Sequence, residues 1–333
     1  MGRRKRVTLR DIAARLGISP FTVSKALSGK PGMSEETREL IIRTAQEMGY
    51  RWKGAGASPP RTVACAVPAR FTGEYAYFAD LLQGAEAAVR EHGDRMTVVS
   101  ITEADEQSLH LPPALLEASG VIYLPLLAPS WLELALKQGP AAIIIGFPDR
   151  HYQADSVVWD AWSGVGLCVD HLVAAGHRRI GYVGTPQVSA GHRLRWVAFQ
   201  EALHEYGLAV DLGDVFHLPH VVTPEETLAA ARDAFGPRRG QLPPALVCDF
   251  ELVAVATARA LSELGETGIA LVCADQLGAG AQLSVPIPHI FYNRPAVGRR
   301  AVERLLRRLD RPDEPYEHIR VAVSLRTNGA GGS

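Results

Sequence analysis

The chain has 333 residues, of which 47% are hydrophobic and 21% are charged, and this length indicates two or three compact units. The apolar content excludes a globally disordered protein, and no run approaches the ~18 consecutive apolar residues that a membrane-spanning helix needs. The first residues, MGRRKRVTLRDIAARLG, lack the apolar stretch of a signal peptide, so we expect a cytoplasmic protein.

The cysteines and the charge distribution narrow the function further. Cys65, Cys168, Cys248 and Cys273 are far apart and form no metal-binding spacing, so we interpret them as buried, reduced thiols and expect no metal and no cofactor. The net charge of −1 hides an asymmetry, because the first 61 residues carry a net charge of +8 and the remainder carries −9. A small basic unit on a mildly acidic body is typical of a protein that binds nucleic acid.

Three short helices are predicted in the basic segment. Thr8 can cap a first helix that ends at Gly17, Ser19 with Pro20 behind it can start a second, and Ser34 can cap a third. Two helices separated by a glycine-containing turn and supported by a third form a helix-turn-helix. The apolar positions at helical spacing are Leu9, Ile12, Ala13 and Leu16, then Val23, Ala26 and Leu27, then Leu40, Ile41, Ala45 and Met48.

Residues 7–50, VTLRDIAARLGISPFTVSKALSGKPGMSEETRELIIRTAQEMGY, resemble the headpiece of the LacI/GalR family of bacterial transcriptional regulators. The resemblance implies that the second helix enters the major groove of DNA with Pro20, Phe21 and Lys25 at base-reading positions. Lys25 can donate to guanine and Phe21 can pack on a thymine methyl group. The other implied DNA-binding residues, which would touch the DNA backbone or cap helices, are Thr8, Ser19, Thr22, Ser24 and Tyr50.

The linker departs from the family pattern. Relatives usually continue with a hinge helix that inserts a leucine pair into the minor groove. Here residues 51–60 read RWKGAGASPP, and two glycines and a Pro-Pro pair disfavour a helix. We therefore expect weak minor-groove contact and little kinking of the DNA.

From residue 62 onward, continuous apolar runs alternate with helical patterns, which predicts parallel sheets covered on both faces. The number of runs predicts an α/β body of two doubly wound lobes, similar to periplasmic binding proteins. We expect lobe 1 at about 62–158 plus 289–316 and lobe 2 at about 159–288 plus 317–328. In such sheets ligands bind beyond the carboxyl ends of the strands, here in a cleft between the lobes. The apolar runs lie at 62–68, 96–101, 120–126, 141–147, 157–160, 179–184, 244–249 and 269–275.

The body also resembles the LacI/GalR family, most closely in HLVAAGHRRIGYVG (171–184) and AVERLLRRL (301–309). The resemblance implies that Arg193 and Asp275 bind an effector, and such a pair suits sugar hydroxyls or a carboxylate. The family's Ala-Asn-Asp turn reads Asp249-Phe250-Glu251 here, so a ring replaces a polar contact. Further effector-site candidates, several of which packing would explain equally well, are Tyr77, Phe78, Asp149 and Phe250, with Trp159 and Asp160 at the crossover between lobes.

Other functions fit the sequence less well. No GxSxG, P-loop, HExxH or SxxK motif indicates an enzyme, and the HxxH of His217 and His220 lies between prolines and is interpreted as a loop. A periplasmic solute-binding protein would share the two-lobed fold but not the headpiece. A regulator that no longer senses a small molecule stays open. We expect a repressor that binds a pseudo-palindromic DNA operator as a homodimer under the control of a small molecule, most simply a sugar.

Overall fold

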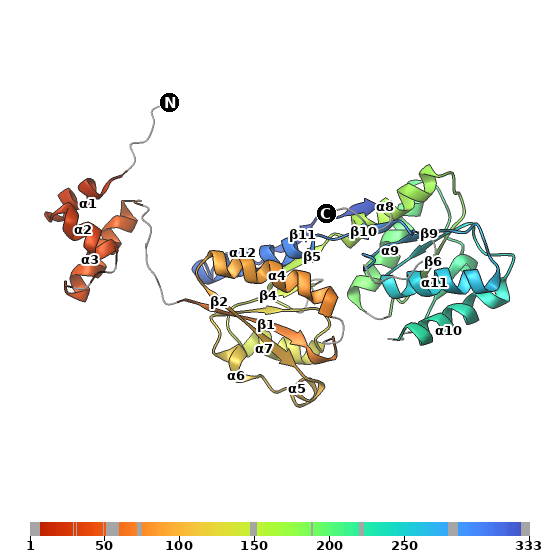
Figure 1. Cartoon of the computed structure of the whole chain (residues 1–333), viewed down its shortest axis with the longest axis horizontal. Helices are drawn as coiled ribbons and strands as arrows, with labels where there is room; N and C mark the ends of the chain where they lie inside the picture. The colour runs from red at the N-terminus through yellow and green to blue at the C-terminus, as the bar shows by residue number, and fades with distance from the viewer. Residues whose placement is uncertain are drawn as a thin grey trace, which may run out of the picture. The chain divides into compact units, whose positions relative to one another are not determined.

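The computed structural model describes most of the chain (Figure 1). It divides into two compact units, Met1–Arg61 and Thr62–Ser333. Among the described residues, no helix is both long and apolar enough to cross a membrane. The described residues are 7–28, 30, 32–48, 50, 60–71, 75–146, 152–187, 189–219, 223–278 and 286–327, with only the backbone described for 46, 71 and 75–77.

The first unit is a three-helix bundle of α1 (Leu9–Leu16), α2 (Pro20–Leu27) and α3 (Glu35–Glu47). Thr8 and Ser19 cap α1 and α2 as predicted, and Ser34 Oγ accepts a hydrogen bond from Thr37 N at the start of α3. Leu40 was predicted to pack inward, but it is 51% exposed, because the inward face of α3 is occupied by Ile41 and Ala45. The core consists of Ile12, Ala13, Val23, Ala26, Leu27, Ile41 and Ala45.

The described part of the second unit contains two six-stranded sheets (Figure 1). Sheet 1 has the order β11-β5-β4-β3-β1-β2, and all its pairs are parallel. Helices α4 (Tyr75–Glu91) and α12 (Arg294–Asp310) cover one face, while α6 (Pro113–Leu116) and α7 (Pro129–Gln138) pack on the other, and α5 (Glu103–Ser108) follows β2. The strands are β1 (Thr62–Pro68), β2 (Arg95–Ile101), β3 (Gly120–Tyr123), β4 (Ala142–Ile145), β5 (Asp155–Trp159) and β11 (His318–Val321).

Sheet 2 has the order β12-β10-β9-β8-β6-β7, and only the β12–β10 pair is antiparallel among the described strands. Helices α8 (Ala161–Ala174) and α9 (Ala190–Glu205) lie on one face, and α10 (Pro224–Phe235) and α11 (Glu251–Leu264) lie on the other. The predicted fold class, a helix-turn-helix unit followed by a two-lobed α/β body, is confirmed. The strands are β6 (Ile180–Gly184), β7 (Val215–His217), β8 (Ala245–Cys248), β9 (Ala270–Cys273), β10 (His289–Phe291) and β12 (Ser324–Arg326).

Through the described strands, the chain passes between the two sheets three times, after β5, after β10 and after β11. The predicted lobe boundaries need two corrections here. Residues 289–291 form β10 and belong to the second lobe, because β10 pairs with β9 and β12. Residues 318–321 form β11 and belong to the first lobe, because β11 pairs with β5.

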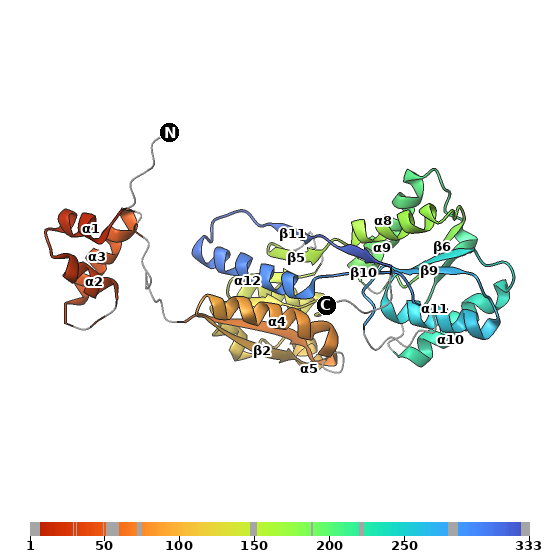
Figure 2. The same cartoon turned by 45° about the horizontal axis from the view of Figure 1, so that its top comes forward.

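Helices α4 and α12 run side by side over sheet 1 (Figure 2) and approach closely at two glycines. A Cβ atom at Gly298 would lie 2.0 Å from the Leu81 carbonyl oxygen, and one at Gly84 would lie 2.0 Å from the Pro295 carbonyl oxygen. The absence of a side chain at both positions therefore allows the two backbones to touch.

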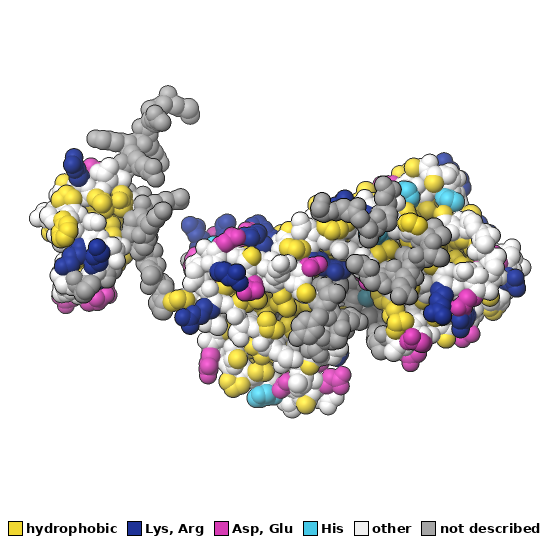
Figure 3. Space-filling view, viewed as in Figure 1, with side chains coloured by type: hydrophobic (Ala, Val, Ile, Leu, Met, Phe, Trp, Pro, Cys, Tyr) yellow, Lys and Arg dark blue, Asp and Glu magenta, His cyan; other side chains and the backbone are white. Residues whose placement is uncertain are grey.

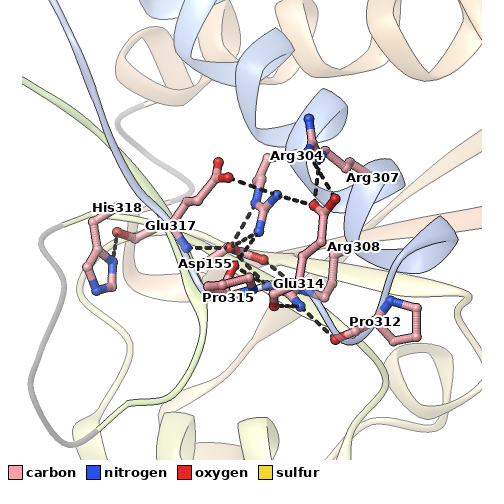
Figure 4. A network of polar contacts seen from close by, with 10 residues as sticks. Asp155, Arg304, Arg307, Arg308, Pro312, Glu314, Pro315, Glu317 and His318 are labelled. Atoms are coloured by element: carbon pink, nitrogen blue, oxygen red, sulfur yellow. Dashed lines mark hydrogen bonds and ion pairs between the residues drawn. The ribbon is translucent and has the colours of Figure 1, made fainter.

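A buried ionic network holds the chain between α12 and β11 (Figure 4). Asp155 is fully buried and accepts hydrogen bonds from Arg304 Nε at 2.8 Å, Arg308 Nε at 2.9 Å and the Glu317 backbone N–H at 2.8 Å. Burial opposes ionisation of Asp155, but these donors together lower the pKa of its carboxyl group below the ordinary value. Glu314 completes the network by accepting from Arg307 at 2.6 Å. Arg304 and Arg308 thus connect α12, and the segment that follows it, to Asp155 at the start of β5.

All four cysteines are buried and form no disulfide. Burial raises the pKa of the Cys65 and Cys248 thiols to about 12. The thiols are therefore inert core groups, in line with the interpretation of the sequence.

Candidate DNA-binding helix and ligand site

The start of α2 is fixed by hydroxyl groups of its own first turn. Ser19 Oγ accepts a hydrogen bond from the Thr22 backbone N–H at 3.0 Å and lies 2.8 Å from the Thr22 hydroxyl oxygen. Pro20 occupies the first helical position, where no backbone N–H is needed. Ser19 and Thr22 are therefore capping residues first, and any contact with a phosphate would use their remaining hydrogen-bonding capacity.

One face of α2 is packed in the core and the other is exposed. Val23, Ala26 and Leu27 are buried, while Pro20, Phe21 and Ser24 are exposed, as helical spacing requires. Phe21 as a whole residue is 76% exposed. The Lys25 ammonium group lies against the loop before α3 and donates to the Gly32 carbonyl at 3.4 Å. Figure 3 shows hydrophobic side chains at the surface of this unit beside lysine and arginine side chains.

Two further predicted DNA contacts have structural partners. The Thr8 hydroxyl donates to the Asp11 carboxylate at 2.7 Å within the cap of α1. The Tyr50 backbone N–H donates to the Ala45 carbonyl at 2.9 Å, and its side chain packs against the core of the unit. The linker at residues 51–59, for which we expect no hinge helix, lies outside the described residues.

In the second unit, polar side chains gather at the carboxyl ends of neighbouring strands of sheet 2. Arg195 comes from α9 and is only 4% exposed. Its Nη2 atom lies 3.3 Å from Asp275 Oδ2, just beyond β9, and 3.5 Å from the Tyr292 hydroxyl, just beyond β10. The Tyr292 hydroxyl in turn donates to the Ala274 carbonyl at 2.8 Å. A guanidinium group and a carboxylate are thus held together where parallel sheets bind ligands.

Asp249 lies in the same cluster, directly after β8, and is fully buried. Its Oδ2 atom accepts a hydrogen bond from the Thr185 backbone N–H at 2.8 Å. Burial raises the pKa of Asp249 to about 7; the Thr185 N–H and the Arg195 charge oppose this rise, and the Asp275 charge adds to it. Within the described residues, Asp249 Oδ1, Arg195 Nε and the Tyr182 hydroxyl are buried without a hydrogen-bond partner. The cluster therefore holds unused polar capacity.

Aromatic side chains flank the cluster. Phe250 precedes α11 and is half-buried, and its ring lies edge-on to His192 of α9 with the ring centres 5.2 Å apart. Trp159 is buried, and its ring centre lies 5.2 Å from that of Tyr292. Asp160 caps α8 by accepting from the Ser163 backbone N–H. Trp159 and Asp160 therefore have structural roles at the first crossover.

Comparison with known proteins identifies both units. Residues 8–52 match the model of the bacterial regulatory proteins of the lacI family, and residues 169–328 match a periplasmic binding protein-like domain. The chain belongs to the LacI family. Its matched relatives include the HTH-type transcriptional repressor PurR of Haemophilus influenzae strain PittEE, 23% identical with 96% of each chain covered. Another is the HTH-type transcriptional regulator MalR of Streptomyces coelicolor, 25% identical, covering 98% of this chain and 96% of that one.

Solved structures show the same fold. A complex of the transcriptional regulator CelR with cellobiose has a TM-score of 0.68 at 23% identity, covering 98% of this chain and all of that one. A lac repressor dimer bound to operator and the anti-inducer ONPF also has a TM-score of 0.68, at 20% identity, covering 96% of this chain and 98% of that one. The relatives named are transcriptional regulators and not enzymes, as expected from the motifs.

In this LacI-family chain, the arginine beside Asp275 differs from the one expected. Arg193 was expected to face the ligand, but it lies on the exposed face of α9, and Arg195 pairs with Asp275 instead. Residues two positions apart in an α-helix are separated by 200° around its axis, so the side chains of Arg193 and Arg195 point in nearly opposite directions. The helical spacing of the sequence could have indicated Arg195, because it shares one face of α9 with apolar residues. The buried positions of α9 are Gly191, Arg195, Ala198, Phe199, Ala202 and Leu203.

The remaining expected ligand contacts are distributed differently. Phe78 is 4% exposed and belongs to the core between α4 and sheet 1. Tyr77 lies in α4, but its side chain is outside the described residues, as is the whole of Asp149. In the sequence, Asp249 was considered only as part of the turn Asp249-Phe250-Glu251, and it was not among the expected ligand contacts. A signal for it exists, because it is the polar residue that directly follows a fully buried strand.

Proposed function

We propose that this LacI-family protein is a transcriptional repressor that binds a pseudo-palindromic operator as a homodimer and is controlled by a small molecule in its body. The observation that carries the proposal is the pair of buried Arg195 and half-buried Asp275 at the carboxyl ends of the strands of sheet 2, in a chain that also carries a helix-turn-helix unit. Among the described residues, the adjoining Asp249 Oδ1 and Arg195 Nε are buried without a hydrogen-bond partner, and they supply an acceptor and a donor for further hydroxyl groups when the cluster opens to a ligand.

We further propose that the ligand is a sugar or a sugar derivative. Neighbouring structures are described with cellobiose, ribose and glucose bound. A carboxylate and a guanidinium group beside aromatic rings match the alternating hydroxyl and C–H surfaces of a sugar. The Phe250 and His192 rings stand at the same end of sheet 2 as Arg195.

The connections between the lobes provide a route for control. The chain crosses between the sheets at three places, so ligand binding that favours one relative orientation of the lobes is transmitted to lobe 1, whose strand β1 begins at Thr62. Thr62 follows directly on the first unit, which ends at Arg61. Coupling of this kind usually changes affinity by ~1–3 kcal/mol. Release or recruitment of DNA follows from which orientation the ligand prefers.

A thermal-shift screen of the full chain against sugars, sugar phosphates, polyols, nucleosides and purines tests the ligand site. A ligand at ~100 times its Kd adds about 2.7 kcal/mol of stability, which corresponds to roughly 5–10 °C for a body of this size. The shift should disappear in Arg195→Ala and Asp275→Ala and persist in Arg193→Ala, the matched control on the same helix. A shift that survives Arg195→Ala would contradict this site, and silence across the panel would favour a regulator that senses no small molecule.

DNA binding is tested with Lys25→Ala on a duplex selected by the full chain from a random pool. If Lys25 reads a base, the variant should lose about tenfold in affinity for the selected duplex, because one specific contact is worth roughly 1–3 kcal/mol, and much less for random DNA. Equal losses on both duplexes would show that Lys25 contributes only charge.

A further inference from the structure

We propose that Phe21 reads the 5-methyl group of a pyrimidine in the major groove, so that this protein distinguishes thymine from uracil and accepts 5-methylcytosine in place of thymine. The inference rests on the proposed function, in which α2 lies in the major groove. It adds the chemical group that the helix recognises and makes operator recognition sensitive to methylation of the DNA.

The exposure of Phe21 is the first observation. The residue is 76% exposed, the highest value of any large hydrophobic residue described in the first unit. The ring takes no part in the core of that unit, so folding does not account for it. Covering a water-exposed phenyl ring with an apolar group lowers the free energy, because apolar surface is removed from water.

The position of Phe21 limits what can cover it. It is the second residue of α2, between Pro20 and a cap closed by Ser19 and Thr22, so its backbone is fixed. Ser24 and Lys25 follow on the same face of the helix. A recognition helix points its first turns at the base edges, so the ring is carried toward the bases.

The hydroxyl groups that precede and follow the ring in the first turn are engaged. The Ser19 and Thr22 hydroxyls bond to each other, while the Lys25 ammonium group, one turn further along, uses one of its three N–H donors on the Gly32 carbonyl. Neither Pro20 nor Phe21 has a polar side-chain atom. The first turn of α2 therefore presents an apolar surface where base readers usually carry amide or guanidinium groups.

The base edges offer one apolar partner. In the major groove, thymine exposes its C5 methyl group, whereas cytosine, adenine and guanine present only polar atoms and C–H groups. Cytosine methylated at C5 carries the same methyl group at the same place. Phe21 thus discriminates by the presence of a methyl group and not by hydrogen bonding.

The test replaces that methyl group without changing base pairing. The full chain first selects a duplex from a random pool, and each thymine is then replaced by deoxyuridine in symmetric pairs. Removal of one methyl group from an apolar contact should weaken binding about fourfold in each half-site, or about fifteenfold for the pair. At the sensitive position, a 5-methylcytosine–guanine pair should bind several-fold more tightly than a cytosine–guanine pair.

Two variants assign the effect to the ring. Phe21→Ala should bind the thymine and uracil duplexes equally while retaining the melting temperature of the wild type, because the side chain is exposed. Leu40→Ala removes another exposed hydrophobic side chain of this unit, on α3, and should keep the discrimination.

The outcomes separate the two proposals. Selection of no duplex would refute the proposed DNA binding and the inference with it. A selected duplex that binds equally well at every uracil substitution would overturn the inference alone. The inference would also fall if Phe21→Ala still discriminated, or if Phe21→Ala lost affinity while the wild type ignored methyl groups, as a ring wedged between base pairs would do.

Discussion

The buried carboxyl group of Asp249 makes the stability of the body depend on pH in an unusual direction. Asp249 is fully exposed in the unfolded chain, where its pKa has the ordinary value of 3.8, and fully buried in the folded chain, where burial raises the pKa to about 7. Between these values the folded protein binds a proton that the unfolded chain does not. The contribution of Asp249 to stability therefore falls as pH rises from about 4 to about 7.

The magnitude follows from the size of the pKa shift. A shift of about three units at 1.36 kcal/mol per unit destabilises the folded state by about 4 kcal/mol above pH 7. Asparagine has the same shape, can accept the Thr185 N–H and does not ionise. Asp249→Asn should thus equal the wild type near pH 4 and exceed it by up to about 4 kcal/mol at pH 8, or about 10 °C in melting temperature.

Urea unfolding of the full chain and of Asp249→Asn at pH 4.5, 6, 7 and 8, followed by tryptophan fluorescence, measures the difference directly. Contributions from all other titrating groups are common to both proteins and cancel in that difference. The groups facing Asp249 are Arg195, Asp275, Tyr182 and Thr185, and none of them is changed. A difference that does not vary with pH, or a wild type more stable than the variant at pH 8, would refute the reasoning.

Two further sets of substitutions are expected to change the stability of the body, and the first of them has the opposite sign to Asp249→Asn. Asp155→Asn, chemically the same change, should destabilise the body by roughly 3–5 kcal/mol at pH 7, because it leaves buried Arg304 and Arg308 without their carboxylate. The pKa of Asp155 is lowered, so its contribution is present above about pH 4 and is lost below; a destabilisation that grew on acidification in urea melts would contradict this. Gly298→Ala should cost roughly 1–3 kcal/mol by forcing α12 away from α4, whereas Gly166→Ala, in α8 with open space around its Cβ, should gain up to about 1 kcal/mol. Melting temperatures test that pair, and equal effects of both glycine substitutions would argue against a close helix contact.

The parts of the fold that could be predicted from the sequence are those that depend on residues close together along the chain. Caps at Thr8 and Ser19 follow from single residues, and strands such as β1 and β8 follow from continuous apolar runs. The short strands β7, β10, β11 and β12 were not foreseen. β11 and β12 alternate between exposed and half-buried residues, but only over three or four positions, which is too short a stretch to reveal a period in the sequence. Only their partners in the sheets define them.

The candidate site was predicted in type but not in every residue. Asp275 was placed by resemblance, yet Arg193 was chosen over Arg195, although the burial period of α9 favours the latter. The charged state of Asp249 could not be foreseen, since it depends on burial beside Arg195 and Asp275, which are distant in sequence. The network of Asp155 with Arg304 and Arg308 likewise joins residues about 150 positions apart.

The repeated passage of the chain between the two sheets constrains how this protein can be synthesised and cut. Lobe 1 needs α12 and β11, and lobe 2 needs β10 and β12, so both sheets wait for residues after 288. On the ribosome, the earlier strands leave an unpaired edge in each sheet until those residues emerge, and such edges favour aggregation. A stop codon at position 318 would remove both β11 and β12 and so take one strand from each sheet. Because each sheet combines strands from before and after α12, neither lobe corresponds to one continuous stretch of the chain.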